Sequence, residues 1–182
     1  MNNGKIAAVV GMCGSGKSVV TEVFKSAGFK SVYFGGVTME ELEKRGLPKT
    51  EANERTVREQ LRAEHGLAAY AVLLYPRIMQ YAEQGGVVLD GLYSWSEYKY
   101  LKERLGDALS VLAIVTDRSV RYERLTGREI RPLTNEEAAA RDTAEIEKLE
   151  KGGPIAIADR YITNNGSTDE LVAAVNKYIS EI

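Results

Sequence analysis

The sequence predicts a three-layer α/β/α sandwich built around a five-stranded parallel sheet. Three observations support this prediction. Short apolar runs of strand length alternate with longer helical patterns along the chain. A glycine-rich turn joins the first apolar run to the first helical pattern. The 182 residues are enough for one domain with a sizeable core, so we expect residues 1–182 to form a single domain.

The glycine-rich turn, residues 11–18, has the form G-x-x-x-x-G-K-[ST] of the phosphate-binding P-loop. Its glycines let several backbone N–H groups point into one cavity, and the following helix adds its N-terminal partial charge. Lys17 is expected to contact the β- and γ-phosphates and Ser18 to ligate Mg²⁺. The alternative is a turn that matches by chance. We therefore expect a P-loop NTPase fold with ATP and Mg²⁺ as cofactors, and the nucleotide-binding residues are Gly11, Met12, Cys13, Gly14, Ser15, Gly16, Lys17 and Ser18.

The strands are predicted from apolar content. Residues 6–10 form the first strand, and the apolar density of 109–115 indicates the centre of a sheet. Residues 87–91 form another apolar run, which contains Asp90 near its end. A short strand at 31–34 precedes two glycines, and the last strand is expected at 160–164, with 155–158 as the alternative placing.

The helices are predicted from start and stop signals. Gly28 is a plausible C-terminal cap of the first helix. Thr38 with Glu41 fits a capping box, Thr50 and Asp117 fit N-caps, and Gly152-Gly153-Pro154 fits a helix stop. The expected helices are 17–27, 38–45, 50–64, 67–84, 94–105, 118–126, 136–151 and 167–180.

Residues 38–84 hold two or three helices between the second and third strands, which is more than a simple crossover needs. We interpret this stretch as a helical subdomain inserted over the sheet. The sequence R-L-T-G-R at 124–128 resembles the P-loop nucleotide kinases, and adenylate kinase in particular, where a similar R-x-x-x-R opens a lid. The resemblance implies that Arg124 lies near the adenine and triphosphate and Arg128 on the phosphates. Because Arg141-Asp142 resembles the return side of such a lid, we expect the lid at 127–141.

Planar guanidinium groups stabilise the charge of a transferred phosphoryl group, so Arg128 with Arg124 or Arg131 is expected to close on it. The alternative is that the arginines pair with glutamates on a solvated helix. For Arg118 and Arg121 this alternative is the preferred interpretation, and the candidate partners are Glu123, Glu129, Glu136 and Glu137.

Asp90 is an acid at the end of a buried apolar strand, where a charge is costly unless it is paired or bound to a cation. We expect it to hold Mg²⁺, usually through water, or to orient the attacking hydroxyl of an acceptor. The alternative is a cap on the helix that follows.

The whole chain resembles a group of small predicted kinases related to dephospho-CoA kinase and adenylate kinase. The resemblance runs through the P-loop, L-P-K-T-E-A-N-E, Q-L-R-A-E-H-G, V-V-L-D-G and A-D-R-Y-I-T-N-N-G-S-T-D-E-L. The last segment is similar to the end of dephospho-CoA kinase, which implies that Asn164, Asn165 and Gly166 lie close to the ATP base. The alternative is a strand-to-helix turn capped by Ser167.

Two positions depart from this pattern. Gly36 stands where the related group has the Asp of G-D-V, and Tyr93 stands where it has the Arg of D-G-I-R. Both departures fall on the acceptor side. The candidates for replacement charge are Arg45, Arg58 and Arg62 on the inserted helices.

Composition excludes several classes of protein. The net charge of −2 and the pI near 5.6 provide no basic surface for nucleic acid. Cys13 is the only cysteine and His65 the only histidine, so neither an intramolecular disulfide nor a histidine metal cluster is expected. No apolar run reaches the ~18 residues of a membrane span or resembles a signal peptide. We expect a cytoplasmic monomer or homodimer.

Two functions remain open at this point. The first is ATP-dependent phosphoryl transfer to a small nucleotide-like acceptor, a nucleoside monophosphate or dephospho-CoA, held by the helices of 38–84. The second is a nucleotide-binding regulatory ATPase with a degenerate acceptor site. A GTPase is disfavoured because the sequence contains no N-K-x-D guanine motif.

Overall fold

The computed structural model describes residues 4–129 and 132–182, and a five-stranded parallel sheet forms its centre. The strands lie in the order β2-β3-β1-β4-β5. Val9 of β1 is level with Asp90 of β3 and with Leu112 of β4. The P-loop after β1 therefore begins close to the carboxyl end of β3. The bounds are β1 Ile6–Val10, β2 Lys30–Tyr33, β3 Val87–Asp90, β4 Leu109–Val115 and β5 Arg160–Thr163.

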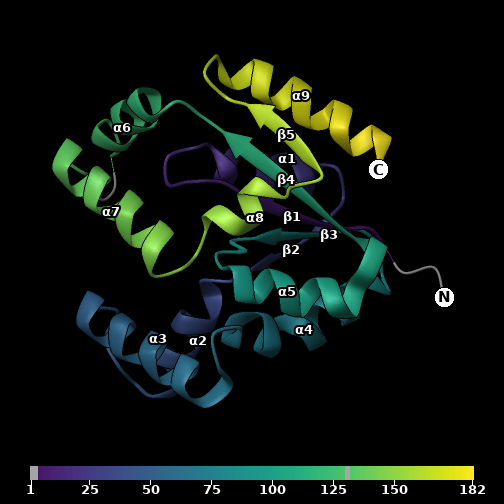
Figure 1. The fold of residues 1–182 in the computed structure, drawn as a ribbon. Coiled ribbons are helices and arrows are strands. Elements are labelled where there is room, and N and C mark those ends of the chain that lie inside the picture. Colours follow the sequence, from purple (N-terminus) through teal and green to yellow (C-terminus); the bar gives the residue numbers. More distant parts are fainter. Residues whose placement is uncertain (1–3, 130–131) are drawn as a thin grey trace.

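Helices cover both faces of the sheet, and this arrangement confirms the predicted fold class (Figure 1). In β1, Ala7 and Val9 belong to the core beneath α1 and α9, whereas Ile6, Ala8 and Val10 belong to the core beneath α4 and α5. This alternation is the two-residue period of a buried strand. The helices are α1 Lys17–Ser26, α2 Gly36–Lys44, α3 Glu51–His65, α4 Ala69–Ala82, α5 Trp95–Leu105, α6 Arg118–Thr126, α7 Asn135–Glu147, α8 Gly152–Ala156 and α9 Thr168–Glu181, and the 3₁₀ turn is Gly106–Ala108.

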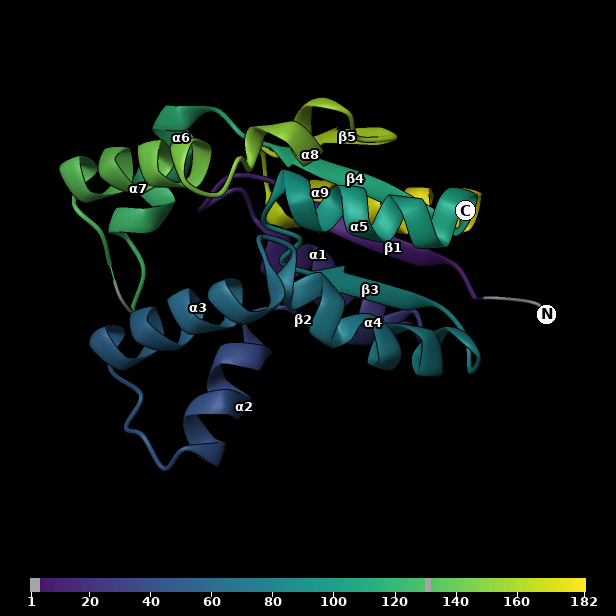
Figure 2. The same cartoon turned by 60° about the horizontal axis from the view of Figure 1, so that its bottom comes forward.

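Two helical arms lie at the end of the sheet toward which the strands point (Figure 2). The α2–α3 arm follows β2, and the α6–α7 arm follows β4. Helix α4 belongs to the sheet layer instead, because Leu74 and Ile78 are buried in the core beside β1, β2 and β3. The region 38–84 is thus divided between an outlying arm and a helix that packs on the sheet.

Most helix starts agree with the signals in the sequence. The hydroxyls of Thr50, Ser94 and Ser167 each accept a hydrogen bond from the backbone N–H three residues later. Thr134 does the same and starts α7. Gly28 has a φ of +91°, as a residue just after a helix commonly does. Local capping chemistry therefore accounts for these boundaries.

Four local predictions were wrong. The expected helix stop Gly152-Gly153-Pro154 lies within α8, and α7 before it already ends at Glu147. Thr38 is not an N-cap, because α2 begins at Gly36 and the Thr38 hydroxyl bonds the Tyr70 hydroxyl at 2.7 Å. Asp117 precedes α6 but makes no side-chain cap. The alternative strand at 155–158 overlaps α8, which begins at Gly152 and contains Pro154 in its first turn, where proline is tolerated.

Candidate functional site

Close packing explains the glycines of the P-loop between β1 and α1. Gly14 and Gly16 have φ angles of +82° and +98°. A Cβ at Gly14 would lie 3.0 Å from the Arg121 carbonyl oxygen, and one at Gly16 would lie 2.3 Å from Asn164 Nδ2. Glycine alone fits both this backbone and these neighbours. The loop is therefore packed against α6 and against the turn after β5.

Lys17, the first residue of α1, folds back over the loop. Its Nζ donates hydrogen bonds to the carbonyl oxygens of Gly11 at 2.8 Å and Met12 at 2.9 Å. Burial lowers the pKa of Lys17 to about 8, the charge of Lys151 adds to this effect, and Glu145 opposes it. The predicted phosphate-binding cation thus lies against carbonyl oxygens of the loop, among other charged groups.

Two side chains are hydrogen-bonded to the backbone of Ser15 in the P-loop. Its carbonyl oxygen accepts hydrogen bonds from Asn164 Nδ2 at 2.8 Å and from the Thr116 hydroxyl at 3.1 Å. The Asn164 backbone N–H in turn donates to the Val115 carbonyl oxygen at 2.8 Å. Asn164, predicted from resemblance to lie near the base, is buried and fixes the back of the P-loop.

The structure brings Arg124 to the same turn. Its guanidinium donates to the carbonyl oxygens of Asn164 at 3.0 Å and Gly166 at 3.2 Å. The Asn165 side-chain oxygen accepts from the Asp117 backbone N–H at 2.9 Å. These residues, which sequence reasoning assigned to the base side, form one cluster between α6 and β5.

Helix α7 reaches the P-loop through a charged residue that sequence reasoning missed. Glu145 Oε2 accepts a hydrogen bond from the Cys13 backbone N–H at 3.1 Å and forms an ion pair with Lys151 Nζ at 2.8 Å. Arg141 Nε lies 3.5 Å from Glu145 Oε1. Lys151 is 2% exposed and lies over the Tyr93 ring, 5.1 Å from its centroid. Nothing in the polar pattern of 136–151 separates Glu145 from the exposed glutamates around it.

Arg121 is also bound to the loop, contrary to the solvated pairing that we expected. Its guanidinium makes two hydrogen bonds to the Asp142 carboxylate, at 2.8 and 2.6 Å, and donates to the Cys13 carbonyl oxygen at 3.0 Å. Both Arg121 and Asp142 are buried. The glutamates expected as partners are not used, because Arg121 faces the P-loop and not solvent.

The two residues expected at a magnesium ion come from adjacent elements. Ser18 is exposed in the first turn of α1. Asp90 is half-buried at the end of β3, where burial raises the pKa of its carboxyl and the charge of Lys17 opposes this shift. Among the described residues there is no group of three or more His, Cys, Asp or Glu that could hold a metal. One hydroxyl and one carboxylate nevertheless fit Mg²⁺, which usually keeps several waters and takes further oxygens from substrate phosphates.

Two further arginines of this region, Arg118 and Arg128, are exposed. Arg128 follows the end of α6, and no hydrogen bond within 4–129 and 132–182 joins it to the P-loop. Arg131 lies outside the described residues. The structure thus divides the arginines, with Arg121 and Arg124 packed inward and Arg128 beyond them.

On the acceptor side, tyrosines pack over glycines. A Cβ at Gly91 would lie 2.5 Å from Tyr93 Cζ, and one at Gly35 would lie 2.3 Å from the Tyr33 hydroxyl oxygen. Burial raises the pKa of Tyr93. The inserted arginines are largely engaged: Arg45 with Glu41 and Gln60, Arg58 with Glu51 and Glu54, and Arg62 over the Tyr70 ring.

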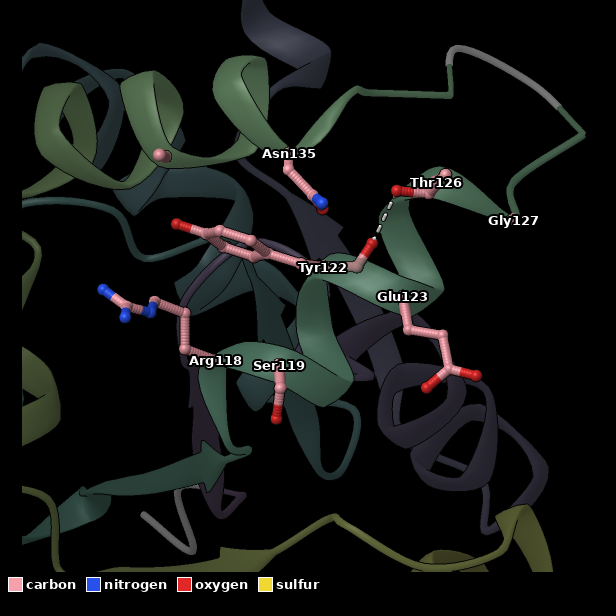
Figure 3. Close-up of a pocket in the computed structure, with 8 residues that line it drawn as sticks. Arg118, Ser119, Tyr122, Glu123, Thr126, Gly127 and Asn135 are labelled. Carbon is pink, nitrogen blue, oxygen red and sulfur yellow. Dashed lines mark hydrogen bonds between the residues drawn. The ribbon is translucent and has the colours of Figure 1, made fainter.

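An open groove of about 870 Å³ runs between α6 and α7 (Figure 3). No P-loop residue lines it. The Tyr122 hydroxyl in this lining donates to Asp142, which also pairs with Arg121, so the groove borders the side chains that hold the P-loop. Its lining residues are Arg118, Ser119, Tyr122, Glu123, Thr126, Gly127, Asn135 and Ala139.

Comparison with known proteins identifies a family and similar solved structures. Residues 8–151 match the AAA_18 family model, described as an AAA domain. A UPF0200 protein from Thermococcus kodakarensis is 37% identical over 181 residues, covering 97% of each chain. The solved structure of TT1252 from Thermus thermophilus is similar with a TM-score of 0.70 and 23% identity, covering 99% of this chain and 98% of that one. The dephospho-CoA kinase from Campylobacter jejuni is similar with a TM-score of 0.57 and 18% identity, covering 97% and 96%. At these identities the solved structures show the fold, which is that of a P-loop kinase.

Within the described residues, no helix combines the length and apolar character that a membrane crossing needs.

Proposed function

The chain belongs to the AAA_18 family of AAA domains, and we propose that it is an ATP-dependent kinase that phosphorylates a small nucleotide-like acceptor. The observation that carries this proposal is the position of the P-loop between two helical arms. The α2–α3 arm and the α6–α7 arm lie at the same end of the sheet as the loop that joins β1 to α1 (Figure 2). Two arms beside one phosphate loop suit a reaction with two substrates that must be shielded from water.

In this proposal the P-loop amides and Lys17 hold the β- and γ-phosphates. Ser18 and Asp90 would hold Mg²⁺, which neutralises charge on the phosphates when bound. An acceptor oxygen forms the new bond to the γ-phosphorus while the bond from the γ-phosphorus to the β–γ bridging oxygen breaks, so the products are ADP and the phosphorylated acceptor. Alternatively, Asp90 would orient the attacking hydroxyl of the acceptor.

The lid residues have separate roles in the proposal. Arg124 would lie beside the base, and its contacts with the Asn164 and Gly166 carbonyl oxygens support this role. Arg128, with Arg131, closes on the transferred group when residues 127–141 move over the loop. Arg121 is assigned a structural role, because its guanidinium is hydrogen-bonded to the Asp142 carboxylate and the Cys13 carbonyl oxygen.

The acceptor is proposed to bind against the helical region 38–84, and its chemical class is a nucleoside monophosphate or a dephospho-CoA type of nucleotide. The resemblance in fold to a dephospho-CoA kinase supports this choice. Arg62 lies over the Tyr70 ring, and within the described residues it forms no ion pair, which supports it as the inserted arginine that would meet an acceptor anion.

A panel of nucleoside monophosphates and dephospho-CoA with radiolabelled ATP tests the proposal. Wild-type protein should phosphorylate one acceptor, and Lys17→Ala should abolish transfer. Asp90→Asn should raise the Mg²⁺ concentration that half-maximal transfer needs. Asp107→Asn, an exposed aspartate in the 3₁₀ turn before β4, is the matched control and should behave as wild type. Wild-type transfer no greater than that of Lys17→Ala for every acceptor would contradict the proposal.

The second candidate is a regulatory ATPase with a degenerate acceptor site. Its support is Tyr93, which replaces the expected arginine and is packed against Gly91 and Lys151. This candidate predicts ATP binding, slow hydrolysis that no acceptor accelerates, and tight binding to a protein partner. Rapid turnover of a small acceptor would exclude it.

A further inference from the structure

The carboxylate of Glu145 makes the contact that a phosphate oxygen makes in a P-loop. The Cys13 N–H is one of the loop amides, and it donates to Glu145 Oε2 at 3.1 Å. Backbone N–H groups of this kind form the anion-binding concavity of such loops. Glu145 comes from α7, is 7% exposed and lies 132 residues from Cys13 in the sequence. A distant carboxylate thus reaches the phosphate-binding cradle.

Two cations surround the same carboxylate. Lys151 Nζ lies 2.8 Å from Glu145 Oε2, and Arg141 Nε lies 3.5 Å from Oε1. Lys151 is almost fully buried, and a buried ammonium is costly unless an anion accompanies it. Glu145 is that anion in the structure. Any anion that replaced Glu145 at the Cys13 N–H would lie next to Lys151.

A phosphate and Glu145 cannot both use the Cys13 N–H. Two negatively charged acceptors at this donor would repel each other in a buried site, where charges interact strongly. Displacement of Glu145 would leave Lys151 with an unpaired charge, and a phosphate oxygen would supply the missing partner. The Arg121–Asp142 pair contacts the Cys13 carbonyl oxygen and not its N–H, so it can persist through this exchange.

We propose that Glu145 and a nucleotide phosphate compete for the Cys13 N–H and the Lys151 ammonium, so that Lys151 is a second phosphate-binding cation beside Lys17. This inference rests on the phosphate binding that the proposed function assigns to the P-loop. It assigns Glu145 the role of an internal competitor that weakens nucleotide binding.

Titration calorimetry with inorganic tripolyphosphate tests the competition without any need for turnover. Glu145→Gln should bind tripolyphosphate about tenfold more tightly than wild type, and Lys151→Met about tenfold more weakly, because each change alters one charge-assisted hydrogen bond. Glu147→Gln and Lys148→Met remove exposed charges from the same segment and should leave binding unchanged. If Lys151→Met does not fold, Lys151→Arg keeps the charge and should retain most of the wild-type affinity.

The outcomes separate this inference from the proposed function. Wild-type binding that Glu145→Gln does not strengthen, or that the two exposed controls alter equally, would overturn the competition. Wild-type protein that binds no tripolyphosphate would overturn both. Wild-type protein that binds tripolyphosphate competitively with ATP but phosphorylates no acceptor would contradict the kinase and leave the competition standing.

Discussion

Arg121 and Asp142 form a buried, bidentate ion pair that joins α6 to α7 next to the P-loop. The two hydrogen bonds measure 2.8 and 2.6 Å, and the same guanidinium holds the Cys13 carbonyl oxygen. The Tyr122 hydroxyl donates to Asp142 at 3.2 Å. The α6–α7 arm is therefore attached to the P-loop at Cys13 by one contact on the carbonyl side and by Glu145 on the N–H side.

Removing Arg121 should destabilise the fold strongly. Arg121→Met leaves Asp142 buried without a partner, and breaking one side of a buried pair costs about 3–5 kcal/mol. Urea denaturation should show this loss, together with weaker ATP binding because the loop loses its anchor. Arg118→Met, on the exposed side of α6, should change stability little. The double variant Arg121→Met/Asp142→Leu should recover part of the loss; a stability equal to wild type in the single variant would show that the pair is not a structural anchor.

Asn164 should tolerate far less change than its neighbour Asn165. Asn164→Asp replaces the NH₂ that donates to the Ser15 carbonyl oxygen with an acceptor, so an oxygen faces an oxygen, at a cost of about 1–3 kcal/mol. Asn165→Asp keeps the acceptor that the Asp117 N–H uses. Urea denaturation and ATP titration of both variants compare the two roles. Equal effects would show that the Ser15 contact does not hold the loop.

The sequence alone was sufficient for the elements whose cause is local. The P-loop motif, the cap at Thr50, the helix starts near Ser94 and Ser167, and the apolar strands depend on residues a few positions apart, and the structure has them close to where they were predicted. Gly153 shows the limit of this reasoning. It indicated a helix stop, yet it lies within α8, and a Cβ there would lie 2.8 Å from the Trp95 ring, so packing against α5 requires the glycine.

The contacts of charged side chains with the P-loop could not be predicted either, because they join residues that are distant in the sequence. The partners of the Cys13 peptide are Glu145 and Arg121, which lie 132 and 108 positions away, and both belong to helices with many similar charges. Only the folded α6–α7 arm distinguishes them. The assigned roles of Asp90, Arg128 and Asn164 in binding nucleotide stay predictions, because the fold positions these residues without testing what they bind.

Glu97 should make the stability of the chain depend on pH. It is 2% exposed in the first turn of α5, where its Oε2 accepts the N–H groups of Tyr93 and Ser94 at 2.9 and 3.0 Å. Burial raises the pKa of Glu97 from 4.5 to about 7, although these two N–H groups and the charge of Arg62 oppose the shift. The native carboxyl therefore keeps a proton at a pH where the unfolded chain has lost it.

The sign follows from proton linkage. Between pH 4.5 and about 7 the native state binds more protons than the unfolded state, so the contribution of Glu97 to stability is complete below pH 4.5 and is lost as pH rises through 7. The loss is on the order of 3 kcal/mol at 1.36 kcal/mol per pKa unit. Glu97→Gln keeps an oxygen for both N–H groups and cannot ionise. Its free energy of unfolding, measured in urea at pH 5, 6, 7 and 8, should exceed that of wild type increasingly toward pH 8. Glu103→Gln, an exposed glutamate on the same helix, should follow the wild-type curve, and parallel curves for wild type and Glu97→Gln would show that Glu97 titrates as an unburied carboxyl.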